Sequence, residues 1–401
     1  MTTADVLAAA PPDLTTTEAE EVARTLFDIG GTARALVSER DQNFLLTDAT
    51  GGEQVLKVSN AAEDRGVVEM EVAAVAHIAT VEPDLPVPVA LPALDGRLIA
   101  ECEVRGARHL VRVIPRMPGR TVASTELDHL AIEQLGQVVA RLGRALRAFF
   151  HPAAGRTIDW DQQRLPGIMP HASLVTDPAR RALLEGVLMR FGDNVLPALP
   201  RLRSQIIHND VTLDNLLLDD QHLVTGIIDF GDMAHTALIL DVPATLQSLV
   251  RDRNDIFDVA EPFLAGYASV TPLEPDESDL LGDLLLGRMA QTILISVERT
   301  RQYPDNAYIH GWLEPAWELL AQLDRIGFDE ASRRLSACSR RLSARRSRSA
   351  RTSFWFACTT VSRAWSSEAC MRSRLNVAST PPLPNSCASC ITSSTYHCAW
   401  L

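Results

Sequence analysis

Apolar and polar positions alternate in short runs over the first 115 residues, whereas later parts of the chain show longer runs with helical spacing. Alternation is typical of half-buried strands, and spacing of three and four residues is typical of amphipathic helices. We expect strands at residues 33–38, 43–47, 54–58, 97–103 and 109–114, and helices at residues 18–27 and 64–80. The pattern predicts a small antiparallel β lobe plus one packed helix, with an N-terminal helix ahead of it.

Helical spacing dominates after residue 115. The clearest predicted helices span residues 128–150, 180–198 and 278–301. Two short apolar runs, residues 205–207 and 223–228, interrupt this pattern, and each ends in an acidic motif. We therefore expect an α+β protein with two lobes, residues 17–115 and a larger, mainly helical lobe at residues 116–330. Residues 1–16 are small and polar, and we expect a disordered lead-in there.

The last part of the chain, residues 331–401, differs in composition from the rest. Eleven of the 38 basic residues and only one of the 51 acidic residues lie there, together with six of the seven cysteines. It shows no sustained helical or strand period, so we expect a tail that is disordered or derived from a frameshift, or else a basic interaction tail. Cys387-x-x-Cys390 is a weak metal motif because no second pair accompanies it.

The two acidic motifs carry the candidate chemistry. His208-Asn209-Asp210 follows the first apolar run, Asn215 lies five residues after Asp210, and Asp229 follows the second run. Phosphoryl transfer needs one carboxylate near the attacking hydroxyl, and an amide oxygen and a second carboxylate for Mg²⁺. The alternative is a hairpin whose Asp and Asn residues only make turns. Turn chemistry requires neither the histidine nor the second acidic cluster, so the spacing favours phosphoryl transfer.

His208-x-Asp210-x4-Asn215, followed by Asp229-Phe230-Gly231-Asp232, resembles the aminoglycoside phosphotransferase and choline kinase superfamily, which is related to the protein kinases. The resemblance covers roughly residues 30–325 and implies a two-lobed, protein-kinase-like fold. It implies that Asp210 is the catalytic base, that Asn215 and Asp229 bind Mg²⁺, and that ATP or GTP is the co-substrate. It also implies that His208 braces the loop. Within the superfamily, the order of features is most similar to the hydroxylysine kinase branch.

Lys57 is the only lysine of the chain and lies in a predicted strand. By the same resemblance it would contact the nucleotide phosphates, for which a compact ammonium is suited; an exposed strand lysine is the plainer alternative. The following helix offers Glu69 and Glu71, and we prefer Glu71 as the partner that orients Lys57. Residues 39–42 lie where kinases fold a loop over the phosphates, although they contain no glycine. Met117, in the predicted link between the lobes, would pack on the purine.

Three further residues are candidates by their positions. Asp241 lies where family members have an aspartate that braces the catalytic loop. Arg288 falls on a largely apolar predicted helix, so it is either paired in the core or aimed at an anionic group of the substrate. In the second case it would hold a substrate carboxylate by bidentate hydrogen bonds. Asp232 is a second possible substrate contact.

Charge limits the partners. Residues 1–330 carry 27 basic and 50 acidic side chains, a net charge of −23. Such a charge argues against non-specific binding of nucleic acid and suits a cationic or zwitterionic small molecule. No apolar run reaches the roughly 18 residues of a membrane span, and the N-terminus lacks a secretory pattern, so we expect no membrane partner and a cytoplasmic enzyme.

The sequence predicts a small-molecule kinase that phosphorylates a hydroxyl group of an amino acid or amino alcohol similar to hydroxylysine. Two alternatives stay open. One is a kinase for an aminoglycoside, homoserine, choline or ethanolamine. The other is a catalytically inactive nucleotide-binding regulatory module, against which the set Lys57, Asp210, Asn215 and Asp229 argues.

Overall fold

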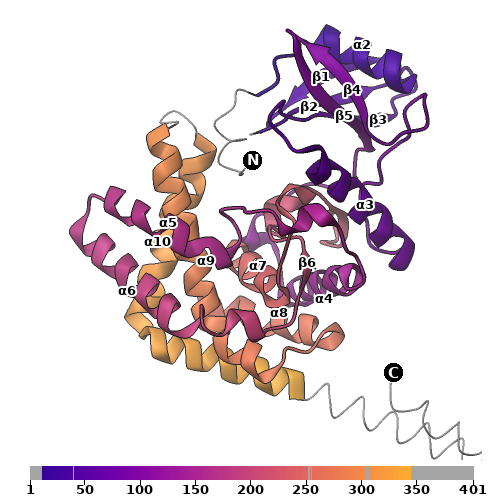
Figure 1. Cartoon of the computed structure of the whole chain (residues 1–401). Coiled ribbons are helices and arrows are strands. Elements are labelled where there is room, and N and C mark those ends of the chain that lie inside the picture. Colours follow the sequence, from indigo (N-terminus) through magenta and orange to yellow (C-terminus); the bar gives the residue numbers. More distant parts are fainter. Residues whose placement is uncertain (1–10, 39, 252, 254, 303–306, 345–401) are drawn as a thin grey trace, which may run out of the picture. The chain divides into compact units, whose positions relative to one another are not determined.

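The computed structural model describes residues 11–38, 40–251, 253, 255–302 and 307–344, and the side chains of residues 307–310 are not described. Five strands form one antiparallel sheet in the order β1-β2-β3-β5-β4 (Figure 1). Their bounds are β1 Thr32–Leu36, β2 Gln42–Thr47, β3 Glu53–Val58, β4 Ala100–Val104 and β5 Ala107–Pro115. All five predicted strands are present, with the fourth beginning three residues later than expected.

Helix α2 (Thr16–Phe27) covers this sheet. Thr15 and Glu18 form a capping box at its start, which satisfies backbone donors that no helical carbonyl reaches. Ala19, Ala23 and Phe27 pack in one apolar cluster with residues of the sheet. Leu14 belongs to the same cluster, and its backbone N–H donates to Gln42 Oε1 at 2.8 Å. The end of the predicted lead-in is therefore packed, while residues 1–10 lie outside the described residues.

Helix α3 (Arg65–Val81) connects the sheet to the helical part of the chain. Asp64 caps its start by accepting a hydrogen bond from the Gly66 backbone N–H. Met70 and Ile78 join the core of the helical part, whereas Val68 packs with hydrophobic residues of β4 and β5 or next to them. The two parts belong to one compact unit, and α3 lies between them in Figure 1.

The remaining residues are mainly helical, as the sequence predicts. The α-helices are α4 His129–Leu146, α5 Leu165–Ile168, α6 Pro178–Asn194, α7 Asp241–Val250, α8 Ile256–Val270, α9 Pro275–Gln302 and α10 Ala307–Ile326. Short 3₁₀ helices include η2 Pro152–Gly155, η3 Gln162–Arg164, η6 Leu213–Asn215 and η7 Phe230–Asp232. β5 ends where the expected first lobe ends, and the division into lobes at residue 115 stays a prediction.

Helices α4 and α8 approach closely because glycines face each other's backbone. A Cβ atom at Gly136 would lie 2.1 Å from the Phe263 carbonyl oxygen, and one at Gly266 would lie 1.8 Å from the Glu133 carbonyl oxygen. Such contacts have no room for a methyl group. The crossing of these two helices therefore depends on both glycines.

Helix α9 is the most buried long helix. Among the described helices it is the one that is long and apolar enough to span a membrane, but 89% of the relevant window is buried inside the protein. Burial of that kind is typical of a helix that forms the core of a globular protein. Arg288 lies on this helix, so the expected largely apolar setting of the arginine is present.

The expected tail begins inside a helix. Residues 328–344 are helical, and Ala331 and Leu335 are buried in the main apolar core. Ser332 Oγ donates to Asp283 Oδ1 at 2.9 Å, and a Cβ atom at Gly282 would collide with Ser332. The first residues of the predicted tail are thus packed against α9. The rest of that tail, including Cys387 and Cys390, lies outside the described residues.

Candidate active site

Two pairs of short strands position the acidic motifs. β6 (Ser204–Ile207) pairs with β9 (Ala234–Ala237), and β7 (Leu216–Leu218) pairs with β8 (Val224–Ile227). The Ile228 backbone N–H donates to the Asn215 carbonyl oxygen at 3.0 Å. These pairings bring the segment after β6 and the segment after β8 together, as the sequence spacing predicts.

Asp210 stands between a cation and an amide. Asn215 Nδ2 donates to Asp210 Oδ2 at 2.8 Å and to the Asp210 carbonyl oxygen at 2.9 Å. Arg288 Nη2 donates to Asp210 Oδ1 at 3.0 Å. Burial raises the pKa of Asp210 to about 7, Arg288 opposes this rise, and the neighbouring carboxylates Asp232 and Asp229 add to it. The carboxyl group therefore titrates near neutrality, which suits a group that accepts a proton.

Asp229 adopts a strained backbone conformation, with φ 60° and ψ 69°. Asn209 also has a positive φ, of 66°. Non-glycine residues rarely occupy this region, and such conformations concentrate at functional sites. Burial alone would raise the pKa of Asp229, but Lys57 and Arg40 together hold it below its ordinary value. Asp229 is thus an ionised carboxylate, and the residue as a whole is exposed.

Lys57 and Asp229 share a small cavity, which Glu71, Arg112 and Phe230 also line. The structure gives Glu71 a different partner from the one expected. Arg112 Nη2 lies 2.5 Å from Glu71 Oε2, and among the described residues Lys57 has no carboxylate within 4.0 Å of its ammonium. Lys57 and Arg112 are cross-strand neighbours on β3 and β5, so both cations point to the same face. Arg112, and not Lys57, is therefore the partner of the Glu71 carboxylate.

Arg40 is a residue that the sequence reasoning did not select. Its Nη2 donates to Asp232 Oδ1 at 3.0 Å, so a side chain from the β1–β2 connection contacts the segment after β8. Arg156 donates to the Gly231 carbonyl oxygen and lies 3.7 Å from Asp232 Oδ1. Asp232, a predicted substrate contact, therefore already faces two guanidinium groups. Only the absence of glycine at residues 39–42 could have drawn attention to Arg40.

His208 and Asp241 contact the backbone of the two segments that carry the acidic motifs. The Asn209 backbone N–H donates to Asp241 Oδ1 at 2.7 Å. His208 Nε2 lies 3.0 Å from the Ile228 carbonyl oxygen, and its ring packs on Phe230 with 4.7 Å between ring centres. Burial lowers the pKa of His208 and raises the pKa of Asp241 to about 7. These contacts hold the two residues before Asp210 in place.

Met117 lies apart from the cavity that contains Lys57. A Cβ atom at Gly226 would lie 2.8 Å from Met117 Cβ, so the methionine packs against β8. It is not among the residues that line the Lys57 cavity. Its contact with a purine stays a prediction.

The cavity that contains Asp210 measures about 110 Å³. Its chemistry-bearing lining residues are Asp210, Asn215, Asp229, Asp232, Arg40 and Arg288. Trp160 closes one side, with its ring centre 4.7 Å from the Arg288 guanidinium carbon and its carbonyl oxygen 3.3 Å from Arg288 Nη1. The cavity brings together the predicted base, both predicted metal ligands and both predicted substrate contacts.

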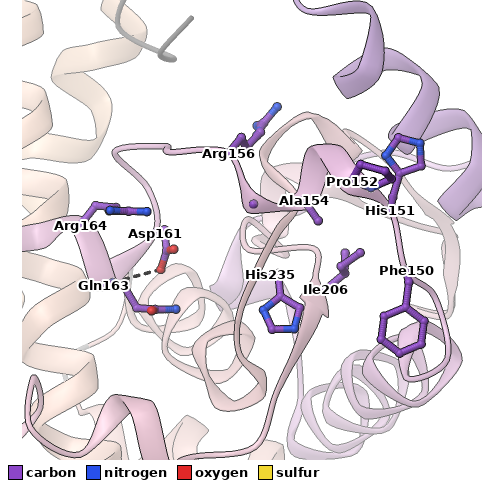
Figure 2. A pocket seen from close by; sticks show the side chains of 11 residues that line it. Phe150, His151, Pro152, Ala154, Arg156, Asp161, Gln163, Arg164, Ile206 and His235 are labelled. Carbon is purple, nitrogen blue, oxygen red and sulfur yellow. Dashed lines mark hydrogen bonds between the residues drawn. The ribbon is translucent and has the colours of Figure 1, made fainter.

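A larger, open cavity of about 580 Å³ is lined by residues that include Ile206 of β6 and His235 of β9. Figure 2 shows Ile206 and His235 close to each other and Arg156 pointing away from them. Asp161 lines this cavity, but its Oδ1 accepts hydrogen bonds from Thr236 Oγ1 and the Gln163 backbone N–H. This larger cavity shares no lining residue with the cavity that contains Asp210. Size alone therefore does not mark the reaction site.

The donor set of the smaller cavity fits a magnesium ion held together with phosphates. Because Asn215 Nδ2 donates to Asp210, its Oδ1 is the atom that a cation would meet, beside the ionised Asp229. In the described part of the chain, no three His, Cys, Asp or Glu side chains converge as a metal site of their own. Mg²⁺ is usually held by one or two carboxylates together with phosphates and water, so this smaller set is the kind expected.

Comparison with known proteins agrees with this geometry. Residues 32–277 match the phosphotransferase enzyme family. Hydroxylysine kinase of Danio rerio is 28% identical over 338 residues, covering 80% of this chain and 95% of that protein. Hydroxylysine kinase of Mus musculus is 26% identical and covers 80% and 92%.

A solved microcompartment-associated aminopropanol kinase has the same fold, with a TM-score of 0.64, 19% identity, and coverage of 78% of this chain and 98% of that one. The two-lobed, kinase-like α+β fold predicted from the sequence is therefore confirmed. The family match spans more than half of the 401 residues, so the chain belongs to the phosphotransferase enzyme family and is, as its sequence predicts, a phosphotransferase.

Proposed function

We propose that this phosphotransferase moves the γ-phosphoryl group of ATP or GTP, with Mg²⁺, to the side-chain hydroxyl of an amino acid or amino alcohol similar to hydroxylysine. The observation that carries the proposal is the single cavity in which Asp210 faces both Arg288 and the pair Asn215 and Asp229. A base, a carboxylate-binding cation and a metal-binding pair are the groups that this reaction needs. The relatives named hydroxylysine kinase support the choice of acceptor because the match covers 95% of the length of one of them.

Asp210 has the role of the base. The acceptor oxygen forms a bond to the γ-phosphorus, the bond from that phosphorus to the bridging oxygen breaks, and the nucleoside diphosphate leaves. Asp210 takes the proton of the hydroxyl. Its carboxylate is oriented by Asn215 and Arg288, so it does not need to reorganise during the reaction.

Two groups hold the nucleotide. Mg²⁺, when bound, would neutralise charge on the transferring phosphoryl group, and Asn215 and Asp229 would hold it. Lys57 lies beside Asp229 and would contact the inner phosphates of the nucleotide. Glu71 shapes this region through Arg112, which it holds against the face of the sheet that carries Lys57. Nucleotide chemistry of this kind belongs in the cytoplasm, where we propose that the enzyme acts.

Arg288 recognises the carboxylate of the acceptor. Its Nη2 donates to Asp210 and its Nη1 makes only a long contact with the Trp160 carbonyl oxygen, whereas its buried Nε has no hydrogen-bond partner. A buried donor without a partner is unfavourable, and a substrate carboxylate would satisfy it. The Trp160 ring holds the guanidinium plane from one side. The result is a cation fixed in position next to the base.

A panel of acceptors tests the proposal. Hydroxylysine, lysine, homoserine, ethanolamine, choline and an aminoglycoside should each be incubated with ATP and with GTP, with release of diphosphate and ³¹P spectra as readouts. We expect a phosphorylated product from hydroxylysine and none from lysine, which lacks the hydroxyl group. Faster turnover of choline or an aminoglycoside than of hydroxylysine would refute the acceptor class. Nucleotide binding without turnover of any member would instead support the inactive regulatory module.

Arg288→Gln tests the carboxylate contact. The ratio of kcat/KM for hydroxylysine to that for its decarboxylated amino alcohol should fall about ten- to a hundredfold, the scale of a hydrogen bond between charged groups. Taking a ratio removes the general loss that follows from disturbing Asp210. An unchanged ratio would show that Arg288 serves the base alone.

A further inference from the structure

Arg40 joins two distant parts of the chain. It lies between β1 and β2, yet its guanidinium contacts Asp232, a residue 192 positions later, at 3.0 Å. The arginine side chain is 20% exposed and the aspartate side chain 9% exposed, so water screens the pair only weakly. The Arg40 carbonyl oxygen also accepts a hydrogen bond from Asn60 Nδ2 at 3.4 Å. The backbone of Arg40 is thus held by Asn60, while its side chain contacts Asp232.

The guanidinium of Arg40 serves as counter-ion to more than one carboxylate. Asp232 is the main cause that raises the pKa of Arg40, and Asp229 adds to it. A Cβ atom at Gly231 would lie 3.2 Å from Asp229 Oδ1 and 3.3 Å from Arg40 Nη2, so both groups flank the same bare Cα atom. In the cavity that contains Asp210, Arg40 therefore lies beside Asp229, the carboxylate that is proposed to hold the metal.

A divalent cation at Asn215 and Asp229 would meet this guanidinium at close range. Two cations at close range repel each other, so Arg40 and a divalent cation should each weaken the binding of the other to these carboxylates. A nucleotide, however, brings phosphate oxygens that a guanidinium binds well. Asp232 would keep a partner if Arg40 left, because Arg156 lies 3.7 Å from the same oxygen.

We propose that Arg40 holds the place of the divalent cation in the empty enzyme and moves to the nucleotide phosphates when that cation binds. The inference rests on the metal-binding role proposed for Asn215 and Asp229. It explains why a loop expected to cover phosphates carries an arginine where protein kinases use glycine. It also gives Arg40 opposite effects on the two ligands, since it competes with the metal and binds the nucleotide.

Metal affinity without nucleotide is the first test. Binding of Mn²⁺ should be measured by electron paramagnetic resonance for the wild type, Arg40→Gln, Asp229→Asn and Arg34→Gln. Arg34 is an exposed arginine of β1 and serves as the matched control. We expect Arg40→Gln to bind Mn²⁺ about tenfold more tightly and the metal–nucleotide complex about tenfold more weakly, the scale of one charge-assisted hydrogen bond. Arg34→Gln should change neither.

Hydrogen exchange separates competition from a simple change of charge. In the wild type, Mg²⁺ alone should raise amide exchange in the β1–β2 hairpin, because the metal displaces Arg40. In Arg40→Gln, exchange should be high from the start and unaffected by Mg²⁺. No response of the wild-type hairpin, or equal Mn²⁺ affinity of Arg40→Gln and Arg34→Gln, would overturn the proposal. Retention of Mn²⁺ by Asp229→Asn would instead overturn the metal site itself.

Discussion

Replacing Arg112 with Met should destabilise the protein by removing the partner of Glu71. The two side chains lie 2.5 Å apart and are only 4% and 12% exposed, and Arg112 Nη1 also donates to Ser59 Oγ at 3.0 Å. Loss of one member of a buried ion pair usually costs about 3–5 kcal/mol, because the other charge stays buried without a partner. Lys57 lines the same cavity and can approach the orphaned carboxylate, so we expect the lower end, about 3 kcal/mol.

A double-mutant cycle isolates this pair. Urea unfolding of Arg112→Met, Glu71→Gln and the double mutant should give a coupling free energy of about 1–3 kcal/mol. The matched cycle with Lys57→Met and Glu71→Gln should give a smaller coupling than the Arg112 cycle, because among the described residues no carboxylate lies within 4.0 Å of the Lys57 ammonium. A larger coupling for Lys57 than for Arg112 would refute the assignment of Arg112 as the partner of Glu71.

Three further changes have defined outcomes. Gly136→Ala should lower the free energy of unfolding by about 2–3 kcal/mol, because the added methyl group collides with the Phe263 carbonyl oxygen; an effect below 0.5 kcal/mol in urea unfolding would contradict the close helix crossing. Folded Asp241, with a pKa of about 7 against an ordinary 3.8, keeps a proton that the unfolded chain loses, so wild-type stability should fall as the pH rises from about 4 to 7. Asp241→Asn should flatten this dependence in unfolding experiments at several pH values, and equal slopes would contradict the buried carboxyl. Lys57→Arg should reduce kcat/KM for the nucleotide at least tenfold in steady-state assays, since the wider fork does not fit the slot of the ammonium; full activity would make Lys57 an ordinary strand lysine.

Periodicity was enough to predict most of the fold. All five strands of the sheet and the helices α2, α3, α4, α6 and α9 follow from local spacing. Most of these elements bury one face and show the other to water, whereas α9 is buried over most of its length. The tail was harder to predict. Residues 331–344 have an unusual composition, yet a few small and apolar side chains, such as Ala331 and Leu335, are enough to pack a helix against α9.

The site was predictable where its chemistry is local. The spacing from Asp210 to Asn215 reflects one loop between β6 and β7, and Asp229 follows the short β7–β8 pair, so a motif captures all three. Contacts between residues far apart in the sequence could not be predicted from such a motif. Arg112 lies opposite Lys57 only because of the β3–β5 register, and Arg40 meets Asp232 only after both parts of the chain have folded.

Asp210 is proposed to take a proton from a hydroxyl during phosphoryl transfer, and the variant Asp210→Asn is the decisive test of this role. The variant keeps the size and shape of the side chain, and thermal unfolding should establish that it is folded. Turnover of hydroxylysine and nucleotide affinity should then be measured on the same preparation. We expect turnover to fall by at least a hundredfold while nucleotide affinity changes less than threefold, since general base catalysis is worth roughly 10²–10⁴ in rate. Turnover near the wild-type rate, or a loss of nucleotide binding that accounts for the whole defect, would contradict it.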